Sequence, residues 1–179
     1  MAAPITATPG LEGIVVAQTQ LSSVNGTEGI LTYRGYNIHD LAQHSNFIEV
    51  CYLLINGELP TAEQFTAFEQ VITYHTMIHE QMNRFFAGFR RDAHPMAILV
   101  ACVGALSAFY HDSLDINNPE HRHISAIRLI AKMPTMVAMA YKYSVGQPSI
   151  YPKNSLSYTA NLMHMLFGTP CEEYEPNDV

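Results

Sequence analysis

The stretch from Arg90 to His121 constrains the fold most, because its middle is apolar on every side. It opens with charged residues and with Pro95, which suits the first position of a helix, where a missing N–H costs little. The run from Met96 to Tyr110 is apolar or small almost throughout. A helix of this kind is either a core helix or a membrane span. Because it is shorter than the roughly 20 residues that a bilayer requires, we predict a buried helix around which other helices pack.

Extended chain precedes the helical part. Residues 1–10 are expected to be a flexible lead-in that ends at Pro9-Gly10, and the pattern from Ile14 to Val24 favours extended chain. Asn25-Gly26 predicts a turn, since both residues tolerate a positive φ. Ile30 to Tyr33 then supplies a returning strand, so the sequence predicts a short N-terminal β-hairpin.

Apolar periodicity and capping residues predict seven or eight helices after residue 36. We expect a helix through His44 capped by Asn37 or Asp40, and one from Phe47 that Ser45-Asn46 caps and that ends at Asn56-Gly57. A third helix is N-capped by Thr61 and has an apolar face to Ile72, and a fourth runs from Thr76 to about Phe89 with Ile78, Met82, Phe85 and Phe86 inward. The core helix follows, then a helix from Asn118-Pro119 and a last one that Ser155 caps and Gly168 stops. Pro134 should break or kink the chain at Met133, which makes Thr135 to Tyr143 a separate or bent helix. The fold class is mostly α.

Composition narrows the classes of function. Hydrophobic residues make up 48% of the chain and charged residues only 14%, well below the usual quarter. This shortage suggests that part of the surface is buried against another subunit or against further chain. The net charge is −7, and no basic cluster exceeds Arg90-Arg91. Nucleic-acid binding is therefore not expected, because it needs a basic footprint.

The cysteines and the first residues indicate the compartment. The three cysteines, Cys51, Cys102 and Cys171, are odd in number and widely spaced, so neither a disulfide framework nor a zinc site is indicated. Cys51 and Cys102 lie in apolar runs typical of core thiols. The start of the chain lacks the basic and apolar regions of a signal peptide. We expect a cytoplasmic protein without a membrane partner.

Charged and imidazole side chains at helical spacing are the remaining candidates for chemistry. His75 and His79 are four residues apart, but no third ligand lies nearby, so partly exposed helix histidines are expected and no metal. His111-Asp112 lacks a Ser or Cys nucleophile and is interpreted as turn chemistry. Arg128 and Lys132 repel by a few tenths of a kcal/mol at this spacing. They form either a solvated face or a site for an anion, which would reverse the sign of that interaction.

Several stretches resemble the citrate synthase family, and together they run from about residue 10 to 175. The matching segments are residues 25–36, 47–58, 75–81, 89–96, 108–115, 132–136 and 143–148. His-Asp-Ser-Leu-Asp at 111–115 and His-Thr-Met-Ile-His-Glu-Gln at 75–81 are similar to the hexameric bacterial subtype that NADH regulates. The resemblance implies the multi-helical citrate-synthase-like large domain in part, with residues 11–179 as its N-terminal portion.

The resemblance implies a transferase of the tricarboxylic acid cycle, which condenses acetyl-CoA with oxaloacetate to citrate and CoA. The acyl group becomes an alkyl group on transfer, and no cofactor is expected. The family's catalytic histidines, catalytic aspartate and citrate-binding arginines are expected downstream of Val179. No catalytic residue is therefore assigned, and the chain alone is expected to be inactive.

The resemblance also implies an allosteric NADH site. Its residues would be His75, Thr76, Tyr110, Arg128, Lys132, Asn154 and Thr169, with Cys171 as a reactive thiol nearby. Tyr74 stands where the regulated form has an arginine, which removes one phosphate-facing charge. The regulated subtype usually begins with a small β-rich domain, whereas only about 10 residues precede the first matching segment here.

Two alternatives stay open at this stage. A 2-methylcitrate synthase would share the scaffold and differ in its acyl-CoA. A non-catalytic helical module, used for oligomerisation or nucleotide binding, would also fit the low fraction of charged residues. The resemblance implies a homodimer or a hexamer in either enzyme.

Overall fold

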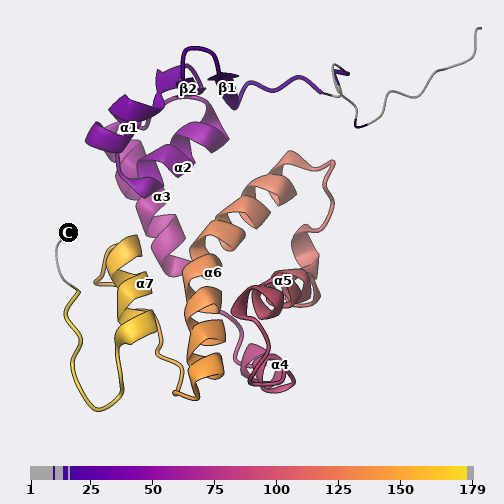
Figure 1. Cartoon of the computed structure of the whole chain (residues 1–179), viewed down its shortest axis with the longest axis vertical. Coiled ribbons are helices and arrows are strands. Elements are labelled where there is room, and N and C mark those ends of the chain that lie inside the picture. Colours follow the sequence, from indigo (N-terminus) through magenta and orange to yellow (C-terminus); the bar gives the residue numbers. More distant parts are fainter. Residues whose placement is uncertain (1–9, 11–13, 16, 177–179) are drawn as a thin grey trace, which may run out of the picture. The chain divides into compact units, whose positions relative to one another are not determined.

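The computed structural model describes residue 10, residues 14–15 and residues 17–176 of the chain (Figure 1). The predicted lead-in therefore lies outside the described residues except for Gly10. The described part is mostly helical, as predicted, with seven α-helices and three short strands. It divides into two compact units, Met1–Thr61 and Ala62–Val179.

The first unit contains an antiparallel sheet of strands β1 (Ser22–Asn25), β2 (Ile30–Tyr33) and β3 (Tyr36–Asn37) in that order. The predicted hairpin and its turn after Asn25 are confirmed, but the turn extends over residues 26–29, and neither Asn25 nor Gly26 has a positive φ. Asn25 pairs with Ile30, and its side-chain oxygen accepts hydrogen bonds from the backbone N–H groups of Thr27 and Glu28. The left-handed residue of this longer loop is Gly29, with φ 68°.

Two capped helices complete the first unit. Asn37 caps α1 (Ile38–His44), and Asn46 forms a capping box with Glu49 at the start of α2 (Phe47–Asn56). Gly57 ends α2 in the left-handed conformation, at φ 96°. These caps follow the prediction because they depend only on residues within one turn of the helix end.

The second unit is built around α6 (Pro119–Val145), which packs against both α5 (Pro95–Ala105) and α7 (Tyr158–Phe167) (Figure 1). The helices α3 (Ala62–Tyr74) and α4 (Met82–Ala87) also contact α6. The 3₁₀ turns η2 (Leu106–Ala108) and η3 (His111–Ser113) link α5 to α6. The core between α4, α5 and α6 includes the buried side chains Met82, Phe86, Ile98, Cys102 and Met136.

The helix predicted from Thr76 to Phe89 is wrong over its first half. Only Met82–Ala87 is α-helical, and the chain between α3 and α4 is irregular. The carbonyls of residues 75–77 accept hydrogen bonds from side chains of α6 instead of from a helix of their own. Phe85, predicted to face inward, is 38% exposed.

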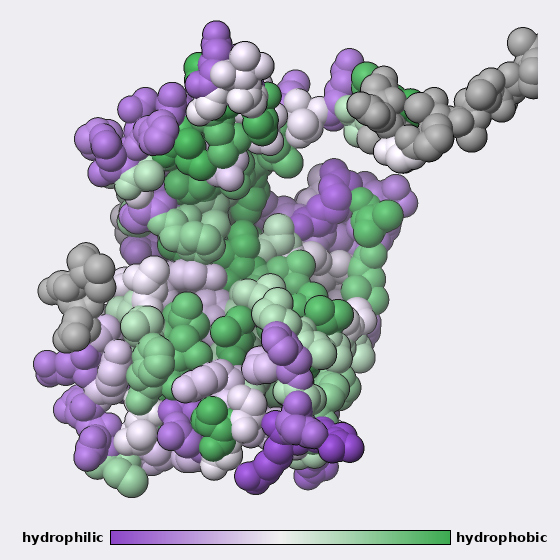
Figure 2. Space-filling view, viewed as in Figure 1, coloured by the Kyte–Doolittle hydropathy of each residue, from purple (hydrophilic) through white to green (hydrophobic). Residues whose placement is uncertain are grey.

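The predicted core helix is buried on one side only. Ile98 and Cys102 are fully buried, whereas Met96 and Val100 are 57% and 71% exposed. Figure 2 shows hydrophobic surface over the region of α5 and α6. The expectation of burial on every side is therefore wrong for the face that carries Met96 and Val100, and the α-helix ends at Ala105 rather than at Tyr110.

The separate helix predicted after Pro134 is absent, because α6 runs through that residue without interruption. The alternative of a bent helix agrees with Figure 1, in which α6 changes direction near its middle. By length and composition α6 could cross a membrane, but half of its most apolar window is buried inside the protein. Lys132 and Lys142 of that helix are also buried. We therefore interpret α6 as a core helix that contains buried polar side chains. The last helix begins at Tyr158 with Ser157 as its N-cap, so the predicted cap at Ser155 is wrong.

Candidate functional site

Polar side chains at intervals of three or four residues form a stripe along α6. Ser125 Oγ donates to the carbonyl of Ser113, and Thr135 Oγ1 donates to the carbonyl of Thr76. Arg128 and Lys132 lie between them in sequence and bind the same two loops. The stripe therefore fastens the loop after α3 and the η3 turn to one face of α6.

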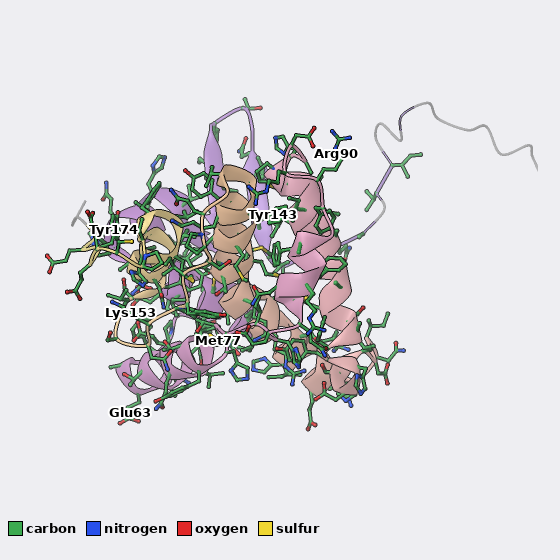
Figure 3. All side chains as sticks on the ribbon, turned by 90° about the horizontal axis from the view of Figure 1, so that it is seen from below. Glu63, Met77, Arg90, Tyr143, Lys153 and Tyr174 are labelled. Atoms are coloured by element: carbon green, nitrogen blue, oxygen red, sulfur yellow. The ribbon has the colours of Figure 1, made fainter. Side chains whose placement is uncertain are left out.

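Lys132 is the most constrained member of this stripe, with only 3% of the residue exposed. Its Nζ donates to the carbonyls of His75 and Met77 at 2.6 and 2.5 Å (Met77 is labelled in Figure 3). Burial, and secondarily the positive charge of Arg128, lowers the pKa of Lys132 to about 8. The ammonium thus takes the place of the helix N–H groups that these carbonyls lack.

Arg128 is held by a carboxylate on the opposite loop. Its Nη1 and Nη2 donate to the two carboxylate oxygens of Asp112 at 3.0 and 3.3 Å, and Nη1 also donates to Ser113 Oγ at 2.7 Å. These contacts lower the pKa of Asp112. The Arg128 side chain is only 18% exposed. The solvated-face interpretation of Arg128 and Lys132 is therefore wrong.

Tyr110 lies against both cations. Arg128 Cζ is 4.6 Å and Lys132 Nζ is 5.1 Å from the centre of its ring. The electron-rich face of a tyrosine attracts a nearby cation, so the ring offsets part of the repulsion between the two charges. Burial raises the pKa of Tyr110, and its hydroxyl stays neutral near pH 7. An incoming anion would have to compete with Asp112 for Arg128.

The residues assigned to the NADH site lie in two places. His75, Thr76, Tyr110, Arg128 and Lys132 come together at the α6 stripe through the contacts described above. The side chain of Thr76 is buried and donates to the carbonyl of Thr73.

Thr169 and Cys171 line a separate open cavity of about 510 Å³. Its wall also includes His164, Lys153 and Tyr174, the last two labelled in Figure 3. Asn154 follows Lys153 in the chain but does not belong to this wall.

The histidine pair does not form the predicted helix face. His75 follows the end of α3, and its Nδ1 is 2.7 Å from the carbonyl of Val71. His79 Nδ1 accepts a hydrogen bond from the backbone N–H of Gln81, and its ring packs on Phe109. In the part of the chain that the structure describes, no three His, Cys, Asp or Glu side chains are grouped as metal ligands.

Two polar side chains of α6 that bind loops of the second unit were not predicted. Thr135 and Lys142 lie in an apolar helix. Their spacing from Arg128 and Lys132 was the feature of the sequence that could have indicated their contacts. Lys142 is 1% exposed, and its Nζ donates to the carbonyl of Gly168 and to Gln147 Oε1. Burial lowers the pKa of Lys142. These contacts tie the end of α6 to the loops on either side of α7.

The chain is similar to one protein family over nearly its whole length. Residues 10–179 match the family model described as citrate synthase, C-terminal domain. The citrate synthase of Pyrobaculum aerophilum is 31% identical, with a TM-score of 0.83 over 97% of this chain and 46% of that one.

Two further solved structures agree with that match. The Thermotoga maritima citrate synthase is 26% identical, with a TM-score of 0.77 over 91% of this chain and 42% of that one. The Thermoplasma acidophilum citrate synthase, in a ternary complex with carboxymethyl coenzyme A and oxaloacetate, is 25% identical, with a TM-score of 0.81 over 89% and 42%. The chain therefore spans just under half the length of the solved structures it matches.

Proposed function

Because the chain belongs to the citrate synthase family, we propose that it is part of an enzyme that condenses acetyl-CoA with oxaloacetate to citrate and CoA. The observation that carries this proposal is the match to the family model over residues 10–179. The Thermoplasma relative, which binds oxaloacetate and a coenzyme A derivative, supports these substrates. The reaction would be an acyl transfer in which the acyl group becomes an alkyl group, at the entry of the tricarboxylic acid cycle.

We propose that this chain supplies scaffold and that the catalytic groups lie in the rest of the enzyme. The share of the relatives' length that it covers supports this division. The test is release of free thiol from acetyl-CoA and oxaloacetate by the purified chain, beside the complete Pyrobaculum enzyme as control. The chain should release none, and turnover comparable to the control would contradict the proposal.

The choice of acyl-CoA is tested in the complete enzyme that contains this chain. A citrate synthase should have a higher kcat/KM with acetyl-CoA than with propionyl-CoA. The reverse order would identify a 2-methylcitrate synthase. If the protein turned over neither acetyl-CoA nor propionyl-CoA but bound nucleotide or self-associated, the non-catalytic helical module would be favoured.

We propose that the cluster of Tyr110, Arg128 and Lys132 binds the phosphates of NADH as an allosteric effector. The closeness of the two cations and their contact with the loop of His75 and Thr76 support this assignment. Asn154 and Thr169, which lie away from this cluster, would contact another part of the nucleotide, with Cys171 as a reactive thiol nearby. Tyr74 is 66% exposed and would leave one phosphate without a cation.

The test is inhibition of the complete enzyme by NADH. Arg128→Gln should weaken inhibition at least about tenfold, since a hydrogen bond to a charged group contributes roughly 1.5–3 kcal/mol. Arg122→Gln is the matched control on the same helix, because Arg122 donates to the carbonyl of Ile116 outside the cluster. Unchanged activity of the wild-type enzyme at millimolar NADH would exclude the site.

We propose a homodimer, or a hexamer built from dimers, in which the exposed face of α5 packs on a second copy. The apolar residues Met96 and Val100 on that face support this, as does the 14% of charged residues in the sequence. Val100→Asp should lower the molar mass measured by light scattering. Val24→Asp, an equally exposed valine on β1, is the control and should not.

We propose the cytoplasm as the compartment, where free thiols such as Cys51, Cys102 and Cys171 stay reduced. Fractionation of the source cells should find the protein in the soluble cytoplasmic fraction. Recovery with membranes would contradict this.

A further inference from the structure

The ion pair between Arg128 and Asp112 is asymmetric. The Arg128 side chain is 18% exposed, whereas that of Asp112 is 66% exposed. The guanidinium is also held without the carboxylate, since Nη1 donates to Ser113 Oγ at 2.7 Å and the centre of the Tyr110 ring lies 4.6 Å from Cζ. The cation is therefore fixed in the protein, and the carboxylate is the partner that solvent reaches.

The carboxylate of Asp112 is weakly attached apart from Arg128. Its other contacts among the described residues are a hydrogen bond of 3.4 Å from Ser113 Oγ and one from its own backbone N–H. The η3 turn has a second attachment to α6, because Ser125 Oγ donates to the carbonyl of Ser113 at 2.9 Å. The carboxylate can therefore leave Arg128 while the turn stays fastened to α6.

The cluster of Tyr110, Arg128 and Lys132 carries an excess of positive charge. With a pKa of about 8, most of the Lys132 ammonium is protonated near pH 7, and its Nζ donates to two neutral backbone carbonyls. Among the ion pairs of the described residues, Asp112 is the one carboxylate that binds either cation. One positive charge therefore remains unbalanced, and it attracts a further anion.

We infer that Asp112 is an internal ligand of this anion site, which a phosphate or pyrophosphate group must displace in order to bind. Carboxylate and phosphate oxygens bind a guanidinium in the same two-pronged manner, so both compete for Nη1 and Nη2 of Arg128. The incoming oxygens take the positions that the exposed carboxylate leaves. The inference rests on the proposed effector site and adds its regulation, because Asp112 sets the concentration at which an anion binds.

Calorimetric titration of the complete enzyme with inorganic pyrophosphate tests the inference. Asp112→Asn removes the competing charge and keeps the shape of the side chain. The dissociation constant of pyrophosphate should therefore fall about two- to fivefold, the range expected for one partly exposed ion pair. Equal dissociation constants for the wild type and Asp112→Asn, or no saturable binding to either, would overturn the inference.

Two comparisons locate the effect. Asp115→Asn removes a carboxylate that accepts from the backbone N–H of Asn117, and it should leave the affinity for pyrophosphate unchanged. Arg128→Gln should weaken binding, and Asp112→Asn should have no further effect in that background. A gain in affinity that Asp115→Asn reproduces, or that persists without Arg128, would overturn the inference. Cooperative thermal unfolding confirms that each variant is folded.

Inhibition by NADH, measured on the same proteins, separates this inference from the proposed effector. If NADH inhibits but Asp112→Asn changes the affinity for neither NADH nor pyrophosphate, the effector site stands and the inference fails. If Asp112→Asn tightens pyrophosphate binding through Arg128 but NADH does not inhibit, the inference stands and NADH is excluded as the effector. If both hold, Asp112→Asn should lower the NADH concentration for half-inhibition by the same factor as the dissociation constant of pyrophosphate.

Discussion

The hydroxyl of Tyr158 on α7 donates a hydrogen bond of 2.9 Å to the carbonyl of Ile130 on α6. In an uninterrupted helix this carbonyl would accept from the N–H four residues later, but that residue is Pro134, which has none. The hydroxyl therefore supplies the donor that the helix lacks at this point. A helix with an internal proline stays continuous here because its neighbour satisfies the freed carbonyl.

Tyr158→Phe should lower the free energy of unfolding by about 1–2 kcal/mol, since it leaves a partly buried carbonyl without a donor. In a Pro134→Ala background the same change should cost less, because alanine restores the helix N–H. Urea denaturation of the four proteins gives the coupling between the two sites. An equal cost of Tyr158→Phe in both backgrounds would show that the hydroxyl does not serve the proline.

Features that depend on residues adjacent in sequence, such as helix caps and helix ends, were predicted correctly. The capping of α1 and α2, the end of α2 at Gly57 and the start of α6 after Asn118 were all predicted from short-range signals. The error at Thr76 to Gln81 and the continuity of α6 at Pro134 have one physical cause. In both places a backbone carbonyl accepts from a side chain far away in sequence, which local periodicity does not reveal.

The candidate site shows the same limit. Arg128 and Lys132 were identified because two like charges four residues apart need a reason. The groups that they bind were not identified. Asp112 was interpreted as a turn residue, and the carbonyls of His75 and Met77 were expected to accept hydrogen bonds within a helix. A buried lysine that binds backbone oxygens leaves no recognisable pattern in the loop that it holds.

Lys132→Met should change how stability depends on pH. Burial lowers the pKa of Lys132 from 10.5 to about 8, so between these values the unfolded chain holds a proton that the folded chain has lost. The free energy of unfolding of the wild type should therefore rise with pH across this window. The variant should lack that part of the rise.

Urea denaturation below, within and above the window measures this difference. Lys153→Met removes a lysine whose side chain is 49% exposed and controls for the loss of one positive charge. Identical pH dependence of Lys132→Met and the wild type would contradict the burial of a titrating ammonium.

The three cysteines should react at different rates with a disulfide reagent near neutral pH. Cys171 is exposed, whereas burial raises the pKa of Cys51 and of Cys102 to about 11. Thiolate is the reactive form, so one fast phase of a single thiol is expected. Cys171→Ser should remove that phase and Cys51→Ser should leave it. A fast phase that survives Cys171→Ser would show that Cys51 or Cys102 is more reactive than its burial and raised pKa indicate.

Gly168→Ala should destabilise the protein because the residue has no room for a side chain. An added Cβ would lie 2.5 Å from the carbonyl oxygen of His164, to which Gly168 also donates its own backbone N–H. The carbonyl of Gly168 accepts from the buried Lys142 at 2.7 Å, so any shift that relieves the clash also strains that contact. The cost should be about 1–3 kcal/mol.

Gly26→Ala provides the matched control in the first unit. No atom lies within 4 Å of a Cβ built at Gly26, and its backbone is not left-handed. The same added methyl group should therefore be neutral, or stabilising by up to about 1 kcal/mol through the unfolded state. Urea denaturation compares the two variants with the wild type. If Gly168→Ala were as stable as Gly26→Ala, the loop after α7 would have to move freely, and Lys142 could not be the anchor that the geometry indicates.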